Sequence, residues 1–338
     1  MPASGTITSS DPGDYESNFR DGRIELVFAH WGEYRARLTW VKLRCLHLLR
    51  SQENLPRIAY LSLPPERVFI GFPSHPNPPQ IWGGMTLQSS DIVLHARGAR
   101  VHQRTSAAST WGLISLSPQQ LAAYSKAVAG IEVVAPAAAK ILRPPLLAKK
   151  QLLRLHAQAC RLAETKPELI LHHEAARAMD HDVLLALIHC LTGDDVHEVT
   201  HAKRRGSCIM VRFEDELVAH QEIPLRVTQL SSKLGISERH LRRSCAEEFR
   251  MEPRKYMRLR RLNMVRAELQ RPDVAMESIA ETIRRHGFSQ PGRFAVLYRQ
   301  VFGETPSATL LRSRGRDPDW PKMHRRRKRS FSPSPRAR

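Results

Sequence analysis

The chain has 338 residues, 41% of them hydrophobic, which is enough to bury a core in about two domains, so a fibre and a disordered polymer are excluded. The mean hydropathy is −0.40, and we find neither an apolar run of about 18 residues nor a secretory leader, so we expect a protein that is not exported and has no membrane partner. Lysine and arginine number 53 against 33 aspartate and glutamate, a net charge of +20, which favours a polyanionic partner such as nucleic acid.

The N-terminal half divides into a flexible start and a domain of strands and helices. Residues 1–20 are rich in Ser, Pro and Gly and are predicted to be a flexible N-terminus. Within residues 21–195, alternating stretches separated by proline and glycine turns predict an antiparallel β domain up to about Ser117. After Pro118 the spacing becomes helical, with an apolar stripe that packs within its own domain or, as an alternative, forms a dimer helix: Leu152, Leu155, Ala159 and Leu162.

Three residue types bear on the chemistry of the chain. The five cysteines are far apart and include no CxxC pair, which predicts buried thiols in a reducing cytoplasm. Four tryptophans either line a ligand pocket or, more commonly in a small β domain, fill its core: Trp31, Trp40, Trp82 and Trp111. We favour core or surface positions over metal ligation for His95, His102, His172 and His173.

Residues 196–221 are predicted to be a linker, although they contain a pattern known from metal enzymes. The letters HEVTH contain His197, Glu198 and His201, and on a helix such an HExxH pattern holds zinc while the glutamate acts as general base. A zinc metalloprotease with Glu216 or Glu222 as third ligand is therefore an alternative. We favour the linker because the intervening residues are poor helix formers, and we predict no enzyme, no metal and no cofactor.

Residues 222–312 contain one unit written twice, each predicted to be helix, tight turn, helix. GISERHL and GFSQPGRF each lie between two apolar-periodic segments, and Gly235 and Gly287 are 52 residues apart. Residues 222–338 carry 28 basic and 12 acidic groups, a net +16, whereas residues 1–221 carry 25 and 21, a net +4. A double helix-turn-helix in so positive a region predicts DNA binding, and the alternative is a plain helical bundle.

In the first unit, Gly235 ends a helix in the left-handed conformation and Ser237 caps the next one. Leu241, Cys245 and Phe249 recur at i, i+4 and i+8, so we expect them to face inward. The outward side then contacts base edges or phosphates through Arg239, His240, Arg242 and Arg243.

In the second unit, Gly287 makes the turn, Ser289 is predicted to cap the following helix, and Phe294 faces inward. Its outward side offers few hydrogen-bond donors, so we expect the first unit to dominate specificity: Gln290, Pro291, Gly292, Arg293 and Val296. Between the units, a helix that starts at Pro253 would act as a rigid connector and present the two recognition helices to major grooves about 34 Å apart.

From about Glu222 to Leu311, the sequence resembles the C-terminal DNA-binding domain of AraC/XylS-type bacterial transcription regulators. The motifs are RKYMRLRRL, GFSQPGRF and YRQVFGETPS, and the GRF and PSATL segments are most similar to the branch that includes the ethanolamine-operon regulator. The resemblance places base contacts on the arginines of the first unit and on residues 291–293 and 296 of the second. The chain departs from the family pattern at Arg250, usually Gly, at Cys245, usually Phe, and at Ile283, usually Ala, so we expect local packing to differ.

The resemblance also implies an effector-binding and dimerisation domain at 21–195, a cupin-like barrel followed by helices. DIVLHARGARVH (91–102) resembles the hairpin of such barrels. The predicted fold class is therefore α+β with two domains, an N-terminal cupin-like antiparallel β barrel with helices and a C-terminal all-α double helix-turn-helix. Residues 313–338, which include RRRKR, are predicted to be a disordered basic tail that adds nonspecific DNA affinity.

The predicted function is sequence-specific transcription regulation, as an activator by family analogy, in the bacterial cytoplasm and at the nucleoid. The expected partners are double-stranded promoter DNA, RNA polymerase, an unknown small-molecule effector and a second copy of the chain. A nonspecific basic DNA-binding protein is the remaining alternative.

Overall fold

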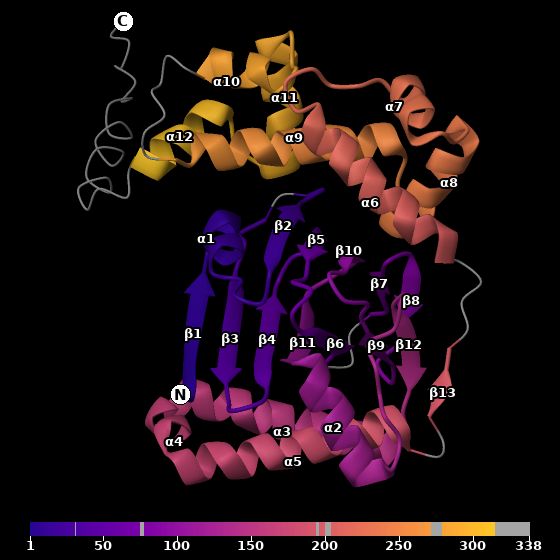
Figure 1. Ribbon diagram of the computed structural model, residues 1–338. Coiled ribbons are helices and arrows are strands. Elements are labelled where there is room, and N and C mark those ends of the chain that lie inside the picture. The colour runs from indigo at the N-terminus through magenta and orange to yellow at the C-terminus, as the bar shows by residue number, and fades with distance from the viewer. Residues whose placement is uncertain (31, 75–77, 194–195, 200–203, 272–278, 315–338) are drawn as a thin grey trace, which may run out of the picture. The chain divides into compact units, whose positions relative to one another are not determined.

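The structure is a computed structural model that describes residues 1–30, 32–74, 78–193, 196–199, 204–271 and 279–314. The chain forms two compact units. Unit 1 comprises Met1–Ala219 and Leu225–Leu259, and unit 2 comprises His220–Pro224 and the chain from Arg260 onward. Unit 1 therefore contains the strands together with the first part of the helical C-terminal region (Figure 1).

The strands of unit 1 form two antiparallel sheets (Figure 1). The first sheet has eight strands in the order β1 (Ala3–Ser9), β3 (Ala36–Lys42), β4 (His47–Glu53), β11 (Ser109–Leu116), β6 (Val68–Pro73), β9 (Ile92–Leu94), β12 (Lys140–Arg143) and β13 (His197–Glu198). The second sheet has five, in the order β2 (Arg23–Val27), β5 (Ile58–Ser62), β10 (Arg100–Arg104), β7 (Gln80–Trp82) and β8 (Met85–Leu87). The predicted antiparallel β domain is present. Among the described residues, however, the pairings leave free edges on both sheets, so the cupin-like closed barrel is not confirmed.

The N-terminal residues are ordered, contrary to the predicted flexible terminus at 1–20. β1 pairs with β3 along its whole length, from Ala3 opposite Lys42 to Ser9 opposite Ala36. α1 (Pro12–Ser17) follows, and the Asp11 carboxylate caps it by accepting the N–H of Gly13 at 2.8 Å. The prediction failed because main-chain pairing with a neighbouring strand orders a small, polar segment that has little apolar pattern of its own.

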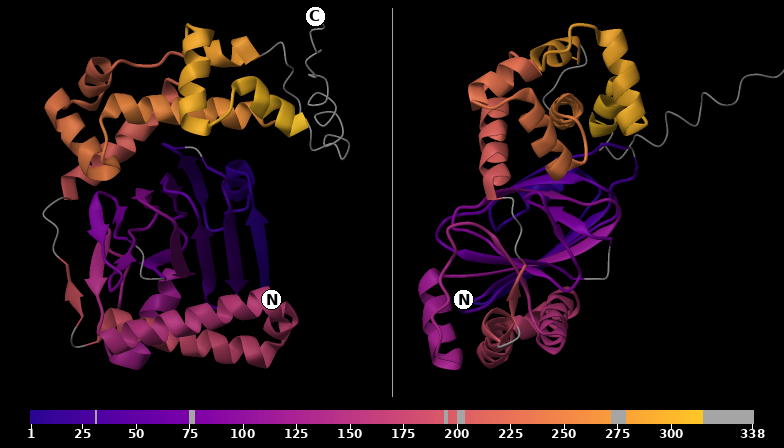
Figure 2. Two further views of the ribbon diagram at one scale, coloured as in Figure 1. Left: turned by 180° about the vertical axis from the view of Figure 1, so that it is seen from behind. Right: turned by 90° about the vertical axis from the view of Figure 1, so that its right-hand side faces the viewer.

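Two hydrophobic clusters hold the sheets and helices together. One cluster takes side chains from both sheets and includes Trp82 and Trp111, so these tryptophans belong to the core. The other lies between the eight-stranded sheet and helices at one end of the strands (Figure 2): α2 (Pro118–Ala129), α3 (Leu146–Thr165), α4 (Pro167–Leu171) and α5 (His173–Thr192). The α3 stripe packs here, with Leu152 and Ala159 fully buried, which confirms that it packs within its own domain.

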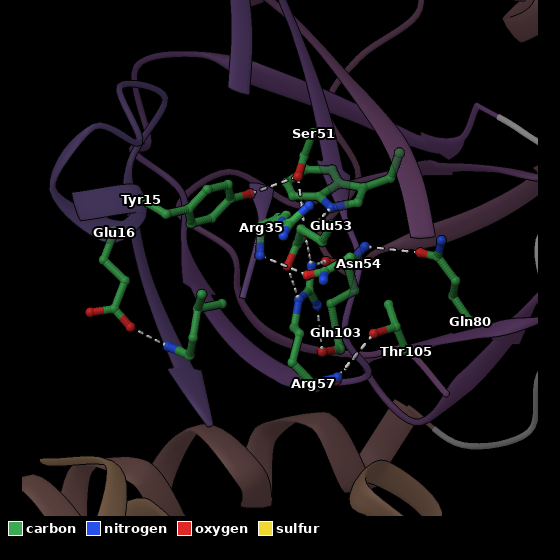
Figure 3. Close-up of polar contacts among 12 residues, drawn as sticks. Tyr15, Glu16, Arg35, Ser51, Glu53, Asn54, Arg57, Gln80, Gln103 and Thr105 are labelled. Carbon is green, nitrogen blue, oxygen red and sulfur yellow. Dashed lines mark hydrogen bonds and ion pairs between the residues drawn. The ribbon is translucent and has the colours of Figure 1, made fainter. Parts of the chain in front are cut away.

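A buried polar network closes on itself inside the β-sheet part (Figure 3). Glu53 and Arg57 are fully buried, and Arg57 donates to both Glu53 oxygens at 2.8 Å. Glu53 also accepts from Trp111 Nε1 at 2.8 Å and from Ser51 Oγ at 3.0 Å. Both of these buried charges have several partners, so neither is left unpaired for a ligand.

The rest of the chain is helical. Its helices are α6 (Arg204–Ala219), α7 (Val227–Leu234), α8 (Glu238–Phe249), α9 (Pro253–Leu269), α10 (Ile279–Arg285), α11 (Pro291–Phe302) and α12 (Pro306–Arg314). α6 lies in the range predicted to be a linker. It is amphipathic and buries Met210 and Phe213, which explains why this segment folds. Residues 315–338 of the predicted basic tail lie outside the described residues.

The structure also bears on the predictions made for the cysteines, for a membrane-spanning helix and for two of the tryptophans. Four cysteines are buried free thiols, as predicted, but Cys208 on α6 is exposed. No helix of the described residues is long and apolar enough to cross a membrane. Trp31 lies outside the described residues, and Trp40 is partly exposed beneath the guanidinium of Arg20.

Candidate nucleic-acid interface

The first helix-turn-helix, α7 to α8, lies wholly in unit 1. α7 ends at Gly235, whose φ of 67° is the left-handed conformation that glycine adopts without steric cost. Ser237 then accepts the backbone N–H of His240 at 3.2 Å and starts α8. The turn predicted from Gly235 and Ser237 is confirmed.

The two faces of α8 are clearly separated. Leu241, Cys245 and Phe249 are fully buried, as their spacing predicts. The four side chains predicted to contact DNA are exposed on the other side of the helix: Arg239, His240, Arg242 and Arg243. α8 therefore has the amphipathic pattern that a recognition helix requires.

Acidic neighbours hold two of these arginines, a feature that the sequence analysis missed. Arg242 lies 3.1 Å from Glu238, and Arg243 lies 3.0 Å from Glu247, both at i, i+4 spacing, which was the available signal. The arginine side chains are 56% and 73% exposed. Exposed pairs of this kind contribute about 0.5 kcal/mol or less, so a phosphate or base edge can replace the carboxylate. Arg239 makes no hydrogen bond or ion pair with the described residues.

α8 ends at Arg250, which has a φ of 54°. It is the only residue other than glycine with a positive φ in the described part of the chain. A side chain in this conformation costs about 1–2 kcal/mol, which explains why glycine is the usual residue here and why the departure at Arg250 matters.

The second helix-turn-helix, α10 to α11, lies in unit 2. Gly287 has a φ of 76°, and a Cβ there would lie 2.2 Å from Pro224, so this turn requires glycine for two reasons. A row of aromatic contacts fills the inside of α11, with ring centroids 4.7, 5.5 and 4.6 Å apart in turn: Phe288, Phe294, Tyr298 and Phe302. The predicted capping by Ser289 is wrong: Gln290 is the N-cap and makes no side-chain bond, because Pro291 fixes the first turn one residue later.

The exposed face of α11 differs from that of α8 in chemistry. All five predicted residues are exposed, and Val296 is 58% exposed. Gln290 and Arg293 are the only hydrogen-bonding side chains among them. Nothing lies within 4 Å of a Cβ built on Gly292, so this face is open.

The comparisons with known proteins concern the same helices. Residues 230–312 match the helix-turn-helix domain family. The "Probable thc operon regulatory protein" of Rhodococcus erythropolis is 36% identical over 96 residues, 28% of this chain and 29% of the relative. The "XylDLEGF operon transcriptional activator 2" of Pseudomonas putida is 37% identical over 101 residues, 30% of this chain and 62% of the relative. The C-terminal part of this chain is an AraC-type helix-turn-helix domain.

The resemblance to AraC/XylS-type regulators is thereby confirmed over this part of the chain. The match spans less than a third of the first relative's length and less than two thirds of the second's. Among solved structures, the AraC-like transcriptional activator CuxR is similar over 78% of this chain and 96% of its own, with 12% identity and a TM-score of 0.41. An AraC-type regulator from Chromobacterium violaceum covers 31% of this chain and 92% of its own, with 26% identity and a TM-score of 0.29.

The HExxH segment lies upstream of the AraC-type domain. His197 and Glu198 form β13, where neighbouring side chains point to opposite faces, and Lys140 lies 2.8 Å from Glu198. A zinc site of this pattern needs a helix, which these two residues do not form; His201 lies outside the described residues. No group of three or more His, Cys, Asp or Glu side chains in the described part of the chain is arranged to hold a metal.

Unit 1 also contains a cavity of about 360 Å³, upstream of the AraC-type domain. Trp82, Val93 and Ile141 from the sheets and Val211 from α6 contribute to its mainly apolar wall. His95 is part of the same wall, is 1% exposed and has no hydrogen-bond partner on either ring nitrogen among the described residues. Burial lowers the pKa of His95 to about 4, so the imidazole is neutral at pH 7 and able to donate or accept.

Proposed function

We propose that this protein is a sequence-specific transcription regulator that binds double-stranded promoter DNA. The observation that carries the proposal is the exposed arginine face of α8 within an AraC-type domain. An arginine fork can donate twice to guanine O6 and N7, or it can grip a phosphate. The residues proposed to contact DNA are those predicted from the sequence on α8 and α11.

The two recognition helices are proposed to contribute unequally. α8 offers three arginines and a histidine, whereas α11 offers Arg293 and Gln290 beside residues suited only to packing. Charged hydrogen-bond donors give most of the discrimination between bases, so α8 is proposed to dominate sequence preference. The net charge of +16 over residues 222–338 adds affinity that does not depend on sequence.

The β-sheet part of unit 1 is proposed to be a cupin-like sensor of a small molecule, which binds in the cavity described above. Its volume lies within the range of small-molecule sites, and an apolar wall with one unpartnered polar group is typical of them. The expected ligand is small and mainly apolar, with one group that hydrogen-bonds to His95. Replacing Val211 with Trp should fill the cavity and abolish the response of DNA affinity to a ligand found by screening.

Dimerisation, contact with RNA polymerase and action as an activator complete the proposal. The relatives from Pseudomonas putida are named as operon activators, and that name supports activation here. The site of action would be the bacterial cytoplasm, at the nucleoid. Light scattering of the purified protein tests the dimer, and transcription in vitro from a selected site tests activation.

The decisive experiment is selection of randomised duplex DNA by the full chain at about 150 mM salt, where attraction to phosphate is partly screened. We expect a sequence motif. Arg242→Ala should alter that motif at one position, whereas Arg154→Ala on α3 is the matched control and should leave it unchanged. Binding without any motif, and abolished by salt, would instead support a nonspecific basic DNA-binding protein.

A further inference from the structure

A buried cluster of charges around His102 joins the β-sheet part of unit 1 to its helices. His102 lies on β10 and is 1% exposed. Its Nε2 lies 2.9 Å from a carboxylate oxygen of Glu214 on α6, and its Nδ1 lies 3.5 Å from Glu248 on α8. The hydroxyl of Tyr256 on α9 donates to Glu214 at 2.6 Å. One imidazole from the sheet thus holds carboxylates from two helices.

Aromatic rings enclose this cluster and exclude water. Phe249 on α8 meets the His102 ring edge-on at 4.6 Å and stacks on Tyr256 at 3.8 Å. Phe213, fully buried on α6, lies 6.3 Å from Phe249. Glu214 is 0% and Glu248 is 4% exposed. In such a dry environment, charge attraction is stronger than at the surface, and a carboxylate that loses its partner is costly.

The charge state of the cluster follows from this arrangement. Burial by itself lowers the pKa of His102, but the hydrogen bonds and charges of Glu214 and Glu248 outweigh it and raise the pKa to about 8. Other charged or titratable groups face the cluster from the surrounding elements: Arg100 on β10, Tyr60 on β5, Asp215 on α6 and Cys245 on α8. Arg100 is paired with Asp215, so His102 is the cation that the two glutamates share.

The cluster leaves the proposed DNA face of α8 free. Glu248 and Phe249 are on the buried side of the helix, while Arg239, Arg242 and Arg243 are on the exposed side. The contact therefore does not cover these three arginines.

The cavity lies directly beside this contact. Arg100 and Val101, next to His102 on β10, are part of the cavity wall. Val211, which is part of the same wall, is one helical turn before Glu214 on α6. A molecule in the cavity would therefore touch both elements that His102 joins.

We propose that His102 is a positioning residue that locks α8 to the β-sheet part through Glu214 and Glu248, so that the sheets set the direction of the first recognition helix. This inference rests on the proposed function for its effect on DNA binding. It predicts that loss of the lock frees α8 and weakens binding at the half of the DNA site that α8 contacts.

The first test uses His102→Gln in the full chain, with His47→Gln on β4 as the matched control. Hydrogen exchange without DNA, corrected for intrinsic rates, should be at least about tenfold faster in α8 for His102→Gln and unchanged in α11. The control should match the unmodified protein. Unchanged exchange in α8 of a folded His102→Gln variant would overturn the proposal, and because no DNA is present, that result is independent of the proposed function.

The second test is the pH profile of binding to the selected DNA, at constant ionic strength. The raised pKa means that the lock is complete below about pH 6.5 and is lost as the pH rises through about 8. Affinity of the unmodified protein should therefore fall between pH 7 and 9, while His102→Gln should be weak and flat over this range. If the unmodified protein binds DNA specifically with a flat profile, the proposal fails while the proposed function stands.

Two milder variants keep the proposal testable if His102→Gln does not fold. Glu248→Gln removes one carboxylate, so the NMR titration midpoint of His102 should move down by about 1 unit or more. Tyr256→Phe keeps the ring stack and removes the hydroxyl, and it should speed exchange in α8 less than Glu248→Gln does. An unchanged midpoint in Glu248→Gln would show that the two groups are not coupled and would overturn the proposal.

Discussion

The two helix-turn-helix motifs come from the same sequence repeat, yet their recognition helices differ on both the exposed and the buried face. α8 exposes three arginines and buries Glu248 and Phe249 against groups that include His102 of the sheets. α11 exposes proline, glycine and valine beside Arg293 and buries a row of aromatic rings within unit 2. The first motif thus has charged donors on its exposed face and an ionic contact with the sheets, whereas the second has an apolar core of its own. The repeat preserves the turn, while the function of each copy depends on the few positions that differ.

The largest expected effect concerns the two cores. Phe249→Ala and Phe294→Ala each remove a buried ring and should cost about 3–5 kcal/mol of unfolding free energy. Phe249 also encloses His102, so its loss should speed hydrogen exchange in α8 and in β10. Phe294→Ala should affect α10 to α12 alone. Val296→Ala, on the exposed side of α11, is the control and should change stability by less than about 0.5 kcal/mol. If both variants changed hydrogen exchange in the same helices and strands, the two motifs would not differ in how their cores are connected to the rest of the chain.

The second prediction compares the exposed faces. Arg242→Ala should cost about 1–3 kcal/mol in DNA binding and relax the preference at one base pair. Arg293→Ala should cost less, since fewer donors surround it. Titration of selected and scrambled sites by fluorescence anisotropy measures both. A larger loss of specificity with Arg293→Ala would reverse the proposed order of α8 and α11.

The third prediction uses the pH dependence of stability to distinguish histidines in unit 1 whose pKa values are shifted in opposite directions. The raised pKa of His102 stabilises the fold below about pH 6.5, and this contribution is lost toward pH 8. Burial lowers the pKa of His95 and His156 to about 4, so their contribution is present above about pH 6.5 and is lost as the pH falls toward 4. At about 1.4 kcal/mol per pKa unit, the alkaline loss is about 2 kcal/mol. The free energy of unfolding, measured with urea, should have a maximum near neutral pH. His102→Gln should remove only its decline at alkaline pH.

The smallest effect concerns the end of α8. Arg250→Gly removes the steric cost of a side chain in the left-handed conformation and should raise the free energy of unfolding by about 1 kcal/mol. Arg243→Gly, inside the same helix, is the control and should lower stability by a similar amount. Thermal unfolding midpoints distinguish the two. Destabilisation by Arg250→Gly would mean that the arginine side chain contributes more than the strained backbone costs.

Local signals were sufficient to predict the recognition helices. Gly235 and Ser237 specify a turn through their own backbone and side-chain chemistry, and the spacing of Leu241, Cys245 and Phe249 fixes the buried side of α8. These features lie within about 15 residues of one another, so sequence patterns contain them.

Contacts between distant segments were not predictable in the same way. β1 is ordered by pairing with a strand about 30 residues later, and the cluster at His102 joins residues that are more than 100 positions apart. Nothing in a short window shows that Glu248 would meet a histidine of the β-sheet part. The helix α6 was missed because poor helix formers at its start concealed the amphipathic pattern of Met210 and Phe213. The capping error at Ser289 is a matter of one residue, decided by Pro291.

The N-terminal strand has a further consequence. β1 covers the outer side of β3 over seven residue pairs, and β3 would otherwise be the last strand of the eight-stranded sheet. Unpaired main-chain groups on an exposed strand are a template for pairing with another molecule. Deleting the first nine residues would therefore move the free edge from β1, whose residues are mostly small and polar, to the more apolar β3, and is expected to increase self-association through the sheet edge.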